Sequence, residues 1–187
     1  MDERRTDTRD RIRAVALELF TTRGYERTSL REIAEHLGVT KAAVYYHFKS
    51  KEDIVGALVG DFLCDVEAIV SWARDREPTL ETRREVIRRY AAVLRSRGAA
   101  MLLFLQQNEP ALQHLPVGAR LEERKRALVR VLTVPGASLT DQLRSRMSVF
   151  ALHAGIFMTQ DLAVTDEERW DAALHTALDL LTPDESR

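Results

Sequence analysis

The sequence predicts an all-α protein of about nine helices. Apolar residues recur three and four positions apart along most of the chain, which is the period of a helix with one buried face. No long stretch alternates with the period of two that half-buried strands require, and runs of β-branched residues are absent. The 187 residues, 45% of them hydrophobic and 30% charged, are enough to build a substantial core.

Each periodic segment is bounded by residues that start or stop a helix. Ser29 and Glu32 have the spacing of a capping box, in which the serine hydroxyl accepts a hydrogen bond from an amide three residues later. Ser50 and Asp53 have a similar spacing, and Pro110 is expected to end the sixth segment. The expected ranges are 6 or 8 to 24, 30–37, 40–48, 50–76, 80–97, 99–109, 117–133, 139–162 and 166–182.

The length of the chain allows one or two domains, and charge is distributed unevenly along it. The chain as a whole has a net charge of −1, but residues 1–51 carry +3 and the remainder carries −4. This mild basic bias at the N-terminal end is compatible with a nucleic-acid partner.

Composition also disfavours several classes of protein. One cysteine, Cys64, allows no intrachain disulfide or zinc site, and we expect it to be a buried or half-buried apolar residue. No catalytic set, phosphate-binding loop or cofactor motif stands out, so we expect neither an enzyme nor a bound cofactor or metal. The charged N-terminus lacks a signal segment and no apolar run could span a membrane, so we expect a cytoplasmic protein.

Residues 30–48 have the pattern of a helix-turn-helix motif. Two short helices flank the turn "LGVT", and the second helix of such a pair lies in the DNA major groove while the first crosses the backbone. At 100° per residue, Val44 and Phe48 point inward together. The other side chains of the second helix are therefore expected on its outer face and flanks.

These outward side chains suit DNA. Ala42 and Ala43 are small enough to let base edges approach, and Lys41 could donate to guanine O6 or N7. The groups that suit phosphates, which fix register rather than sequence, belong to Tyr45, Tyr46, His47 and Lys51. Amides and hydroxyls at Thr28 and Ser29, where the first helix of the motif begins, suit another phosphate.

The spacing alone leaves other interpretations open, because many helix pairs joined by a glycine turn bind no nucleic acid and paired tyrosines also suit a protein contact. The stretch "TRDRIRAVALELFTTRGYERTSLREIAEHLGVTKAAVYYHFKSKEDI", however, closely resembles the N-terminal domain of the tetracycline-repressor (TetR) family of bacterial transcriptional regulators. The matching signs are "A..LF...GY..TS...IA..LGV.K.A.YYHF..K..L", with Ile54 at the last position, and they cover about residues 8–56.

The resemblance implies two domains: a three-helix DNA-binding head over residues 1–52 and a larger helical body over residues 53–187 that binds a ligand and dimerises. It also implies a two-fold dimer on a pseudo-palindromic double-stranded DNA operator. It implies structural roles for Gly24 and Tyr25, and a helix after residue 50 that links head to body. By position, it implies DNA contacts at Thr28, Lys41, Ala42, Ala43, Tyr45, Tyr46, His47 and Lys51.

From the motif and the resemblance we expect a homodimeric repressor that a small apolar or amphipathic effector releases from its operator. The alternative is a DNA-binding protein, architectural or linked to cell division, that acts through protein partners and senses no small molecule. A closed apolar pocket in the body would distinguish the two.

Residues that could line such a pocket are bulky apolar or polar side chains in the body, most of which are expected to pack the core instead. The pocket candidates are Phe62, Val66, Trp72, Tyr90, Met101, Phe104, Leu105, Gln107, Met147, Phe150 and His153. Apolar stripes on the last two helices are expected to form a dimer face, or else to cover the core of their own chain. The dimer candidates are Leu143, Ala151, Ala154, Met158, Trp170, Leu174, Ala177 and Leu178.

Overall fold

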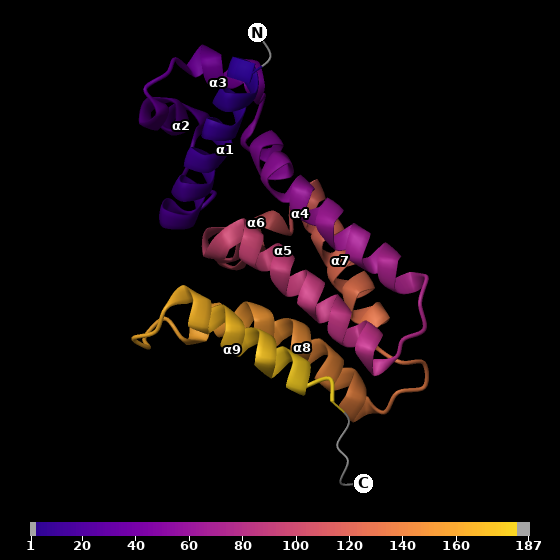
Figure 1. Cartoon of the computed structure of the whole chain (residues 1–187). Helices are drawn as coiled ribbons and strands as arrows, with labels where there is room; N and C mark the ends of the chain where they lie inside the picture. Colours follow the sequence, from indigo (N-terminus) through magenta and orange to yellow (C-terminus); the bar gives the residue numbers. More distant parts are fainter. Residues whose placement is uncertain (1–2, 183–187) are drawn as a thin grey trace. The chain divides into compact units, whose positions relative to one another are not determined.

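The computed structural model describes residues 3–182, and over this range the chain forms nine α-helices and no strand (Figure 1). The all-α prediction is therefore confirmed. The helices are α1 (Glu3–Arg23), α2 (Leu30–Leu37), α3 (Lys41–His47), α4 (Lys51–Arg74), α5 (Leu80–Gln107), α6 (Glu109–Leu112), α7 (Pro116–Leu132), α8 (Leu139–Met158) and α9 (Asp166–Asp179).

The helix starts follow the capping residues that the sequence indicates. The Ser29 hydroxyl accepts from the Glu32 amide at 3.2 Å while the Glu32 carboxylate accepts from the Ser29 amide at 2.8 Å, which completes the predicted capping box. The Asp53 amide likewise donates to the Ser50 hydroxyl at 3.1 Å. Gly38 ends α2 in the left-handed conformation, with φ of 67°, which costs glycine little because it has no Cβ.

Two predicted helix ends are wrong, at Pro110 and in the eighth helix. Pro110 does not end a helix: it lies at the start of α6, where a missing amide hydrogen costs nothing because the first turn has no intrahelical acceptor. Gly98 interrupts α5 with φ of 75° and ψ of 164°, as the separate ranges 80–97 and 99–109 predict, and helical residues continue directly on both sides of it. The eighth helix ends at Met158, four residues before the expected end.

Contacts within the chain divide it into two compact units, each of which has its own core. The first comprises Met1–Leu63 and Ala100–Leu121, and the second comprises Cys64–Ala99 and Glu122–Arg187. The predicted boundary after residue 52 stays a prediction. The C-terminal part of α5, all of α6 and the start of α7 thus fold with the N-terminal helices rather than with the remaining body.

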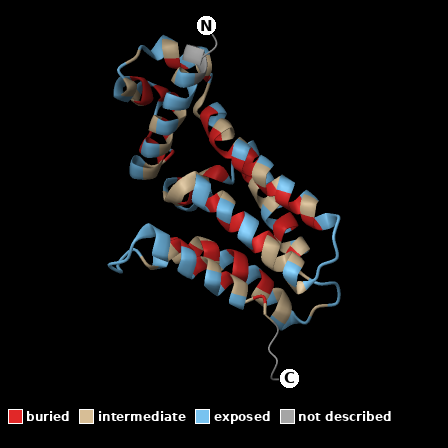
Figure 2. Ribbon diagram, viewed as in Figure 1, coloured by how far each residue is buried: buried red, intermediate tan, exposed pale blue. Residues whose placement is uncertain are grey.

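The first unit is built around α1, which packs against α2, while α2 packs against α3. Ile12, Phe20, Ile33 and Val44 are fully buried in its core, and buried positions recur along the helices in Figure 2. Phe20 joins two segments that are far apart in sequence, because its ring contacts Tyr25 at a centroid distance of 5.4 Å and Phe104 at 5.8 Å.

The second unit contains the pair of helices α8 and α9, which pack side by side (Figure 1). A Cβ added to Gly155 in α8 would lie 2.5 Å from the Ala173 Cβ in α9, so the glycine permits this close approach within the chain. Leu152 and Ala177 are fully buried. Cys64, predicted to be buried or half-buried, is exposed instead.

Candidate nucleic-acid interface

Helix α3 divides its side chains as the helical angles predict. Val44 is fully buried and Phe48, just after the helix, is 2% exposed, so these two side chains fix α3 to the core of the first unit. On the outer face, Tyr46 is 66% exposed and Tyr45 is 38% exposed. Lys41 and Ala42 are exposed as well, while Ala43 and His47 are half-buried.

The N-terminus of α3 is held in place by its cap. The Thr40 hydroxyl accepts a hydrogen bond from the Ala43 amide at 3.2 Å, and threonine is one of the residues preferred at this position. At the other end, the Lys49 ammonium donates to the Tyr45 carbonyl at 3.0 Å, where the last carbonyls of a helix lack intrahelical donors. Lys41 lies 5.2 Å from the centre of the Tyr45 ring, a favourable cation–π distance.

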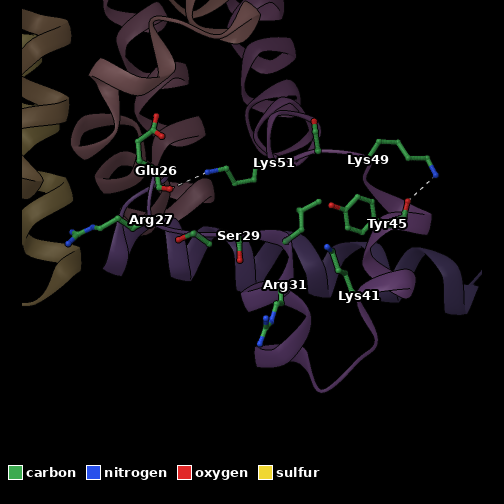
Figure 3. A pocket seen from close by; sticks show the side chains of 11 residues that line it. Glu26, Arg27, Ser29, Arg31, Lys41, Tyr45, Lys49 and Lys51 are labelled. Atoms are coloured by element: carbon green, nitrogen blue, oxygen red, sulfur yellow. Dashed lines mark hydrogen bonds between the residues drawn. The ribbon is translucent and has the colours of Figure 1, made fainter.

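A concave pocket of about 440 Å³ lies beside α3 in the first unit (Figure 3). Five of its lining residues are basic and one, Glu26, is acidic, which makes it a cationic site under neutral conditions. The lining residues are Glu26, Arg27, Thr28, Ser29, Leu30, Arg31, Lys41, Tyr45, Lys49, Ser50 and Lys51.

The pocket brings together predicted residues from both helices of the motif. Lys41 and Tyr45 come from α3, Ser29 caps α2, and Lys51 begins α4. The amides at the start of α2 precede its first intrahelical hydrogen bond, so this helix end also favours anions. Such a site can accept one or more phosphate groups, and the neighbouring exposed face of α3 can enter a groove.

Thr28 has a structural role that the sequence did not indicate. It is only 2% exposed, and its hydroxyl donates to the Gly24 carbonyl at 2.9 Å. The Ser29 hydroxyl is also occupied, because it donates to the Glu32 carboxylate at 2.8 Å. These two hydroxyls therefore support the start of α2, and a ligand there would have to exchange with internal hydrogen bonds.

Lys51 contacts the loop between α1 and α2. Its ammonium donates to the Tyr25 carbonyl at 2.9 Å and lies 4.3 Å from the centre of the Tyr25 ring. It also approaches the Glu26 carbonyl at 3.5 Å (Figure 3). Lys51 thus fastens the loop at the edge of the pocket while it adds positive charge there.

Sequence reasoning did not select three basic residues of the pocket as site residues, namely Arg27, Arg31 and Lys49. Arg27 and Arg31 flank the Ser29 cap, and a cluster of arginines around the start of the first motif helix was the available signal. It was hard to recognise because arginines on helix surfaces usually contact only solvent or a neighbouring carboxylate. Arg31, for example, donates to the Glu35 carboxylate at 2.7 Å.

The predicted effector-pocket residues are divided between the two units. Phe62, Met101, Phe104, Leu105 and Gln107 belong to the first, whereas Val66, Trp72, Tyr90, Met147, Phe150 and His153 belong to the second. Phe62, Val66, Met101 and Phe104 are buried and Leu105 is half-buried, whereas Gln107, Met147 and Phe150 are exposed. Trp72 is half-buried and carries Arg76 and Arg89 near its ring, at 4.4 and 4.1 Å from its centre.

Tyr90 and His153 do meet, in the second unit. The Tyr90 hydroxyl and the His153 Nε2 are hydrogen-bonded at 2.8 Å, which joins α5 to α8. Burial raises the pKa of the Tyr90 phenol. Burial, with a smaller effect from the positive charge of Lys125, lowers the pKa of His153 to about 4. Both groups are therefore neutral around pH 7, as expected of a core histidine.

This pair predicts a pH-dependent stability. The unfolded chain protonates His153 near its ordinary pKa of about 6.5, whereas the folded chain does so only near 4, so unfolding takes up a proton between these values. The free energy of unfolding should therefore fall as the pH drops below about 6.5, by at most about 1.4 kcal/mol per pH unit from this group. Urea unfolding of the wild type and His153→Phe at several pH values measures this. A stability difference between the two that does not change from pH 7 to pH 4 would contradict it.

The predicted dimer residues fall into three groups by exposure. Leu143 and Met158 are 57% and 74% exposed, and they lie on α8 with other exposed apolar residues. Ala154, Trp170 and Ala177 are buried within their own chain. Ala151, Leu174 and Leu178 are half-buried.

Among residues 3–182, no three His, Cys, Asp or Glu side chains gather closely enough to hold a metal ion. No helix within that range combines the length and apolar character needed to cross a membrane.

Comparison with known proteins agrees with this geometry. Residues 12–58 match the family model described as bacterial regulatory proteins, tetR family. The regulator TcmR of Streptomyces glaucescens is 30% identical over 192 residues, a match that covers 95% of this chain and 84% of TcmR. The regulator AcrR of Shigella flexneri is 52% identical over 48 residues, which cover 26% of this chain and only 22% of AcrR.

Solved structures resemble the whole chain in fold. The ketosteroid transcriptional regulator KstR2 of Mycobacterium tuberculosis superimposes with a TM-score of 0.72 at 21% identity, over 95% of this chain and 96% of KstR2. AmtR of Mycobacterium smegmatis gives a TM-score of 0.69 at 24% identity, over 95% of this chain and 87% of AmtR. At these identities the likeness concerns the arrangement of helices.

Proposed function

This chain belongs to the TetR family of bacterial regulatory proteins, and we propose that it is a homodimeric repressor that binds a pseudo-palindromic operator and is released by a small effector. The observation that carries the proposal is the cationic pocket beside the outer face of α3. Lys41 and Tyr45 belong both to the pocket and to the outer face of α3, so a DNA duplex bound at one of these surfaces would also contact the other.

The two surfaces suit two parts of a DNA duplex. Phosphate oxygens accept charge-assisted hydrogen bonds, which the basic pocket offers from Arg27, Arg31 and Lys49. The outer face of α3 presents Lys41 and Ala42 to base edges, while Tyr46 extends from the same helix. Phosphate contacts would fix the register of α3 in the groove, and the lysine would supply the main base-specific donor.

The exposed face of α8 supports the homodimer. Five apolar side chains recur at helical spacing along it and are exposed, with no cover from the other residues that the structure describes. They are Leu139, Leu143, Met147, Phe150 and Met158. A two-fold axis would place each stripe against its copy, and two heads would then meet two operator half-sites.

The effector is proposed to be a small apolar or amphipathic molecule, bound in the body. Support comes from the buried apolar residues of α4 and α5 together with the neutral Tyr90–His153 pair, which could exchange its internal bond for one to a ligand. A ligand that binds the released form 100-fold more tightly would shift the equilibrium by about 2.7 kcal/mol.

DNA binding is tested by selecting duplexes from a randomised library with the full-length protein and then measuring affinity for the selected duplex over about 50–200 mM salt. We expect an affinity that falls steeply with salt. Failure of the wild type to enrich any sequence would overturn the proposal.

Lys41→Met is expected to relax the preference at one operator position by about 1–3 kcal/mol if Lys41 donates to guanine. Lys125→Met is the matched control, because Lys125 is an exposed lysine on α7, outside the pocket. It should leave both the preference and the salt dependence unchanged. An equal loss on all sequences for Lys41→Met would assign Lys41 to a phosphate instead.

A further inference from the structure

Asn108 departs from the usual behaviour of an asparagine at a helix start. It occupies the N-cap position of α6, where an asparagine side chain ordinarily accepts from an amide of its own helix, yet it makes no such bond. Its carboxamide is 95% buried and contacts α1 and the loop after it. These partners lie more than 80 residues earlier in the chain.

Both the oxygen and the nitrogen of this carboxamide form hydrogen bonds within the chain. The oxygen accepts from the Tyr25 amide at 2.7 Å, and the nitrogen donates to the Phe20 carbonyl at 3.2 Å and the Phe104 carbonyl at 2.9 Å. A flipped carboxamide would place its NH₂ against the Tyr25 amide and its oxygen against two carbonyls, so the partners fix its orientation. Among the common side chains of this size, only asparagine supplies one acceptor and two donors in this geometry.

Tyr25, the residue that Asn108 holds, is bonded in turn to the edge of the cationic pocket. Its carbonyl accepts from the Lys51 ammonium at 2.9 Å and from the Thr28 amide at 3.2 Å. Its hydroxyl donates to the Glu52 carboxylate at 2.8 Å. The next residues in the chain, from Glu26 to Arg31, line the pocket.

We propose that Asn108 is a positioning residue for the DNA-binding surface: it fixes the Tyr25 loop, and through it the placement of Lys51 and the start of α2. The inference rests on the proposed function, since it assigns Asn108 a part in DNA affinity. It also makes the α5–α6 junction an integral part of the DNA-binding head, although it lies outside the helix-turn-helix sequence.

The test compares Asn108→Ala with Leu112→Ala in the full chain. Both residues belong to the α6 region of the first unit and both are buried, but Leu112 offers only an apolar side chain. Affinity for a selected operator is measured under conditions in which urea unfolding shows that both variants are folded. We expect Asn108→Ala to lose about tenfold or more in affinity, since it leaves the Tyr25 amide without its acceptor and removes the side-chain donor to the Phe20 and Phe104 carbonyls. The loss of DNA affinity in Leu112→Ala should be severalfold smaller than in Asn108→Ala.

A double-mutant cycle with Lys51→Met separates positioning from simple loss of stability. If Asn108 acts through Tyr25 and Lys51, its substitution should weaken DNA binding much less when Lys51 is already replaced. Losses that add fully, or an equal loss in Leu112→Ala and Asn108→Ala, would overturn the positioning role.

Hydrogen exchange at the Tyr25 amide gives a readout that needs no DNA. We expect faster exchange in Asn108→Ala than in Leu112→Ala, because only the first removes the acceptor of that amide. Unchanged exchange would overturn the positioning role whatever the wild type binds. A wild type that binds no DNA, with normal Tyr25 protection, would instead overturn the proposed function.

Discussion

Replacement of Phe150 by aspartate is expected to convert the proposed dimer into a monomer. Phe150 is 55% exposed in the chain and lies near the middle of the apolar stripe on α8. In a two-fold dimer each copy of that residue would lie in the interface, so one substitution introduces two carboxylates there. Burial of an unpaired charge costs several kcal/mol, which is enough to raise the dimer dissociation constant at least 100-fold.

The loss of the dimer should also abolish tight operator binding. A dimer binds two half-sites with a second step that is effectively intramolecular, and a monomer loses that advantage of about 10²–10⁴ in affinity. Sedimentation or light scattering reports the oligomeric state, and binding to a selected operator reports the affinity. The pocket on the first unit is unaltered by the substitution, so weak, salt-dependent binding to any duplex should remain.

Gln113→Asp is the control for added negative charge, because Gln113 is exposed at the end of α6 and lies outside the α8 stripe. It should leave the dimer intact. A Phe150→Asp protein that stays dimeric at micromolar concentration, and keeps the operator affinity of the wild type, would show that the α8 stripe is not the interface.

Much of the first unit could be predicted from local sequence. Capping pairs such as Ser29 and Glu32 act over three residues, and the inward direction of Val44 and Phe48 follows from helical angles alone. The exposed outer face of α3 follows from the same angles. Features of this kind depend on few neighbours, which is why a single sequence indicates them.

The features that were missed depend on residues far apart in the chain. Nothing local indicates that Asn108 hydrogen-bonds Tyr25 rather than capping its own helix. The inclusion of residues 100–121 in the first unit has the same origin. Pro110 was misread for a different reason, since proline is equally compatible with the end of one helix and the first turn of the next.

The sequence also does not indicate which residues of an apolar stripe pack in the core of their own chain and which are available for an interface. Periodicity shows that α8 and α9 have apolar faces, but it gives the same signal for a face that covers its own chain and one that covers a partner. Ala154 and Ala177 turn out to be buried by the chain itself, whereas Leu143 and Met158 are left exposed. Only the packing of α8 on α9 separates these two sets.

Gly98→Ala and Gly60→Ala are expected to change stability in opposite directions. Both glycines are half-buried, and a Cβ added to either would meet no atom within 4 Å, so crowding affects neither variant. Their backbones differ. Gly60 lies within α4, whereas Gly98 interrupts α5 with φ of 75° and ψ of 164°, a region that is essentially restricted to glycine.

Gly98→Ala should therefore lower the free energy of unfolding by about 1–3 kcal/mol, the cost of holding an L-residue in that conformation. Gly60→Ala should raise it by about 0.5–1 kcal/mol, because alanine loses less backbone entropy than glycine when it enters a helix. Urea unfolding followed by circular dichroism measures both, and similar m-values would show that the extent of unfolding is unchanged.

If Gly98→Ala is as stable as Gly60→Ala and gains helical signal, α5 has become continuous through residue 98, and the interruption is not required by the surrounding packing. If the expected loss occurs, the left-handed break is required by the residues on both sides of it. The interruption at Gly98 would then let α5 supply Tyr90 to the core of the second unit and Phe104 to the core of the first.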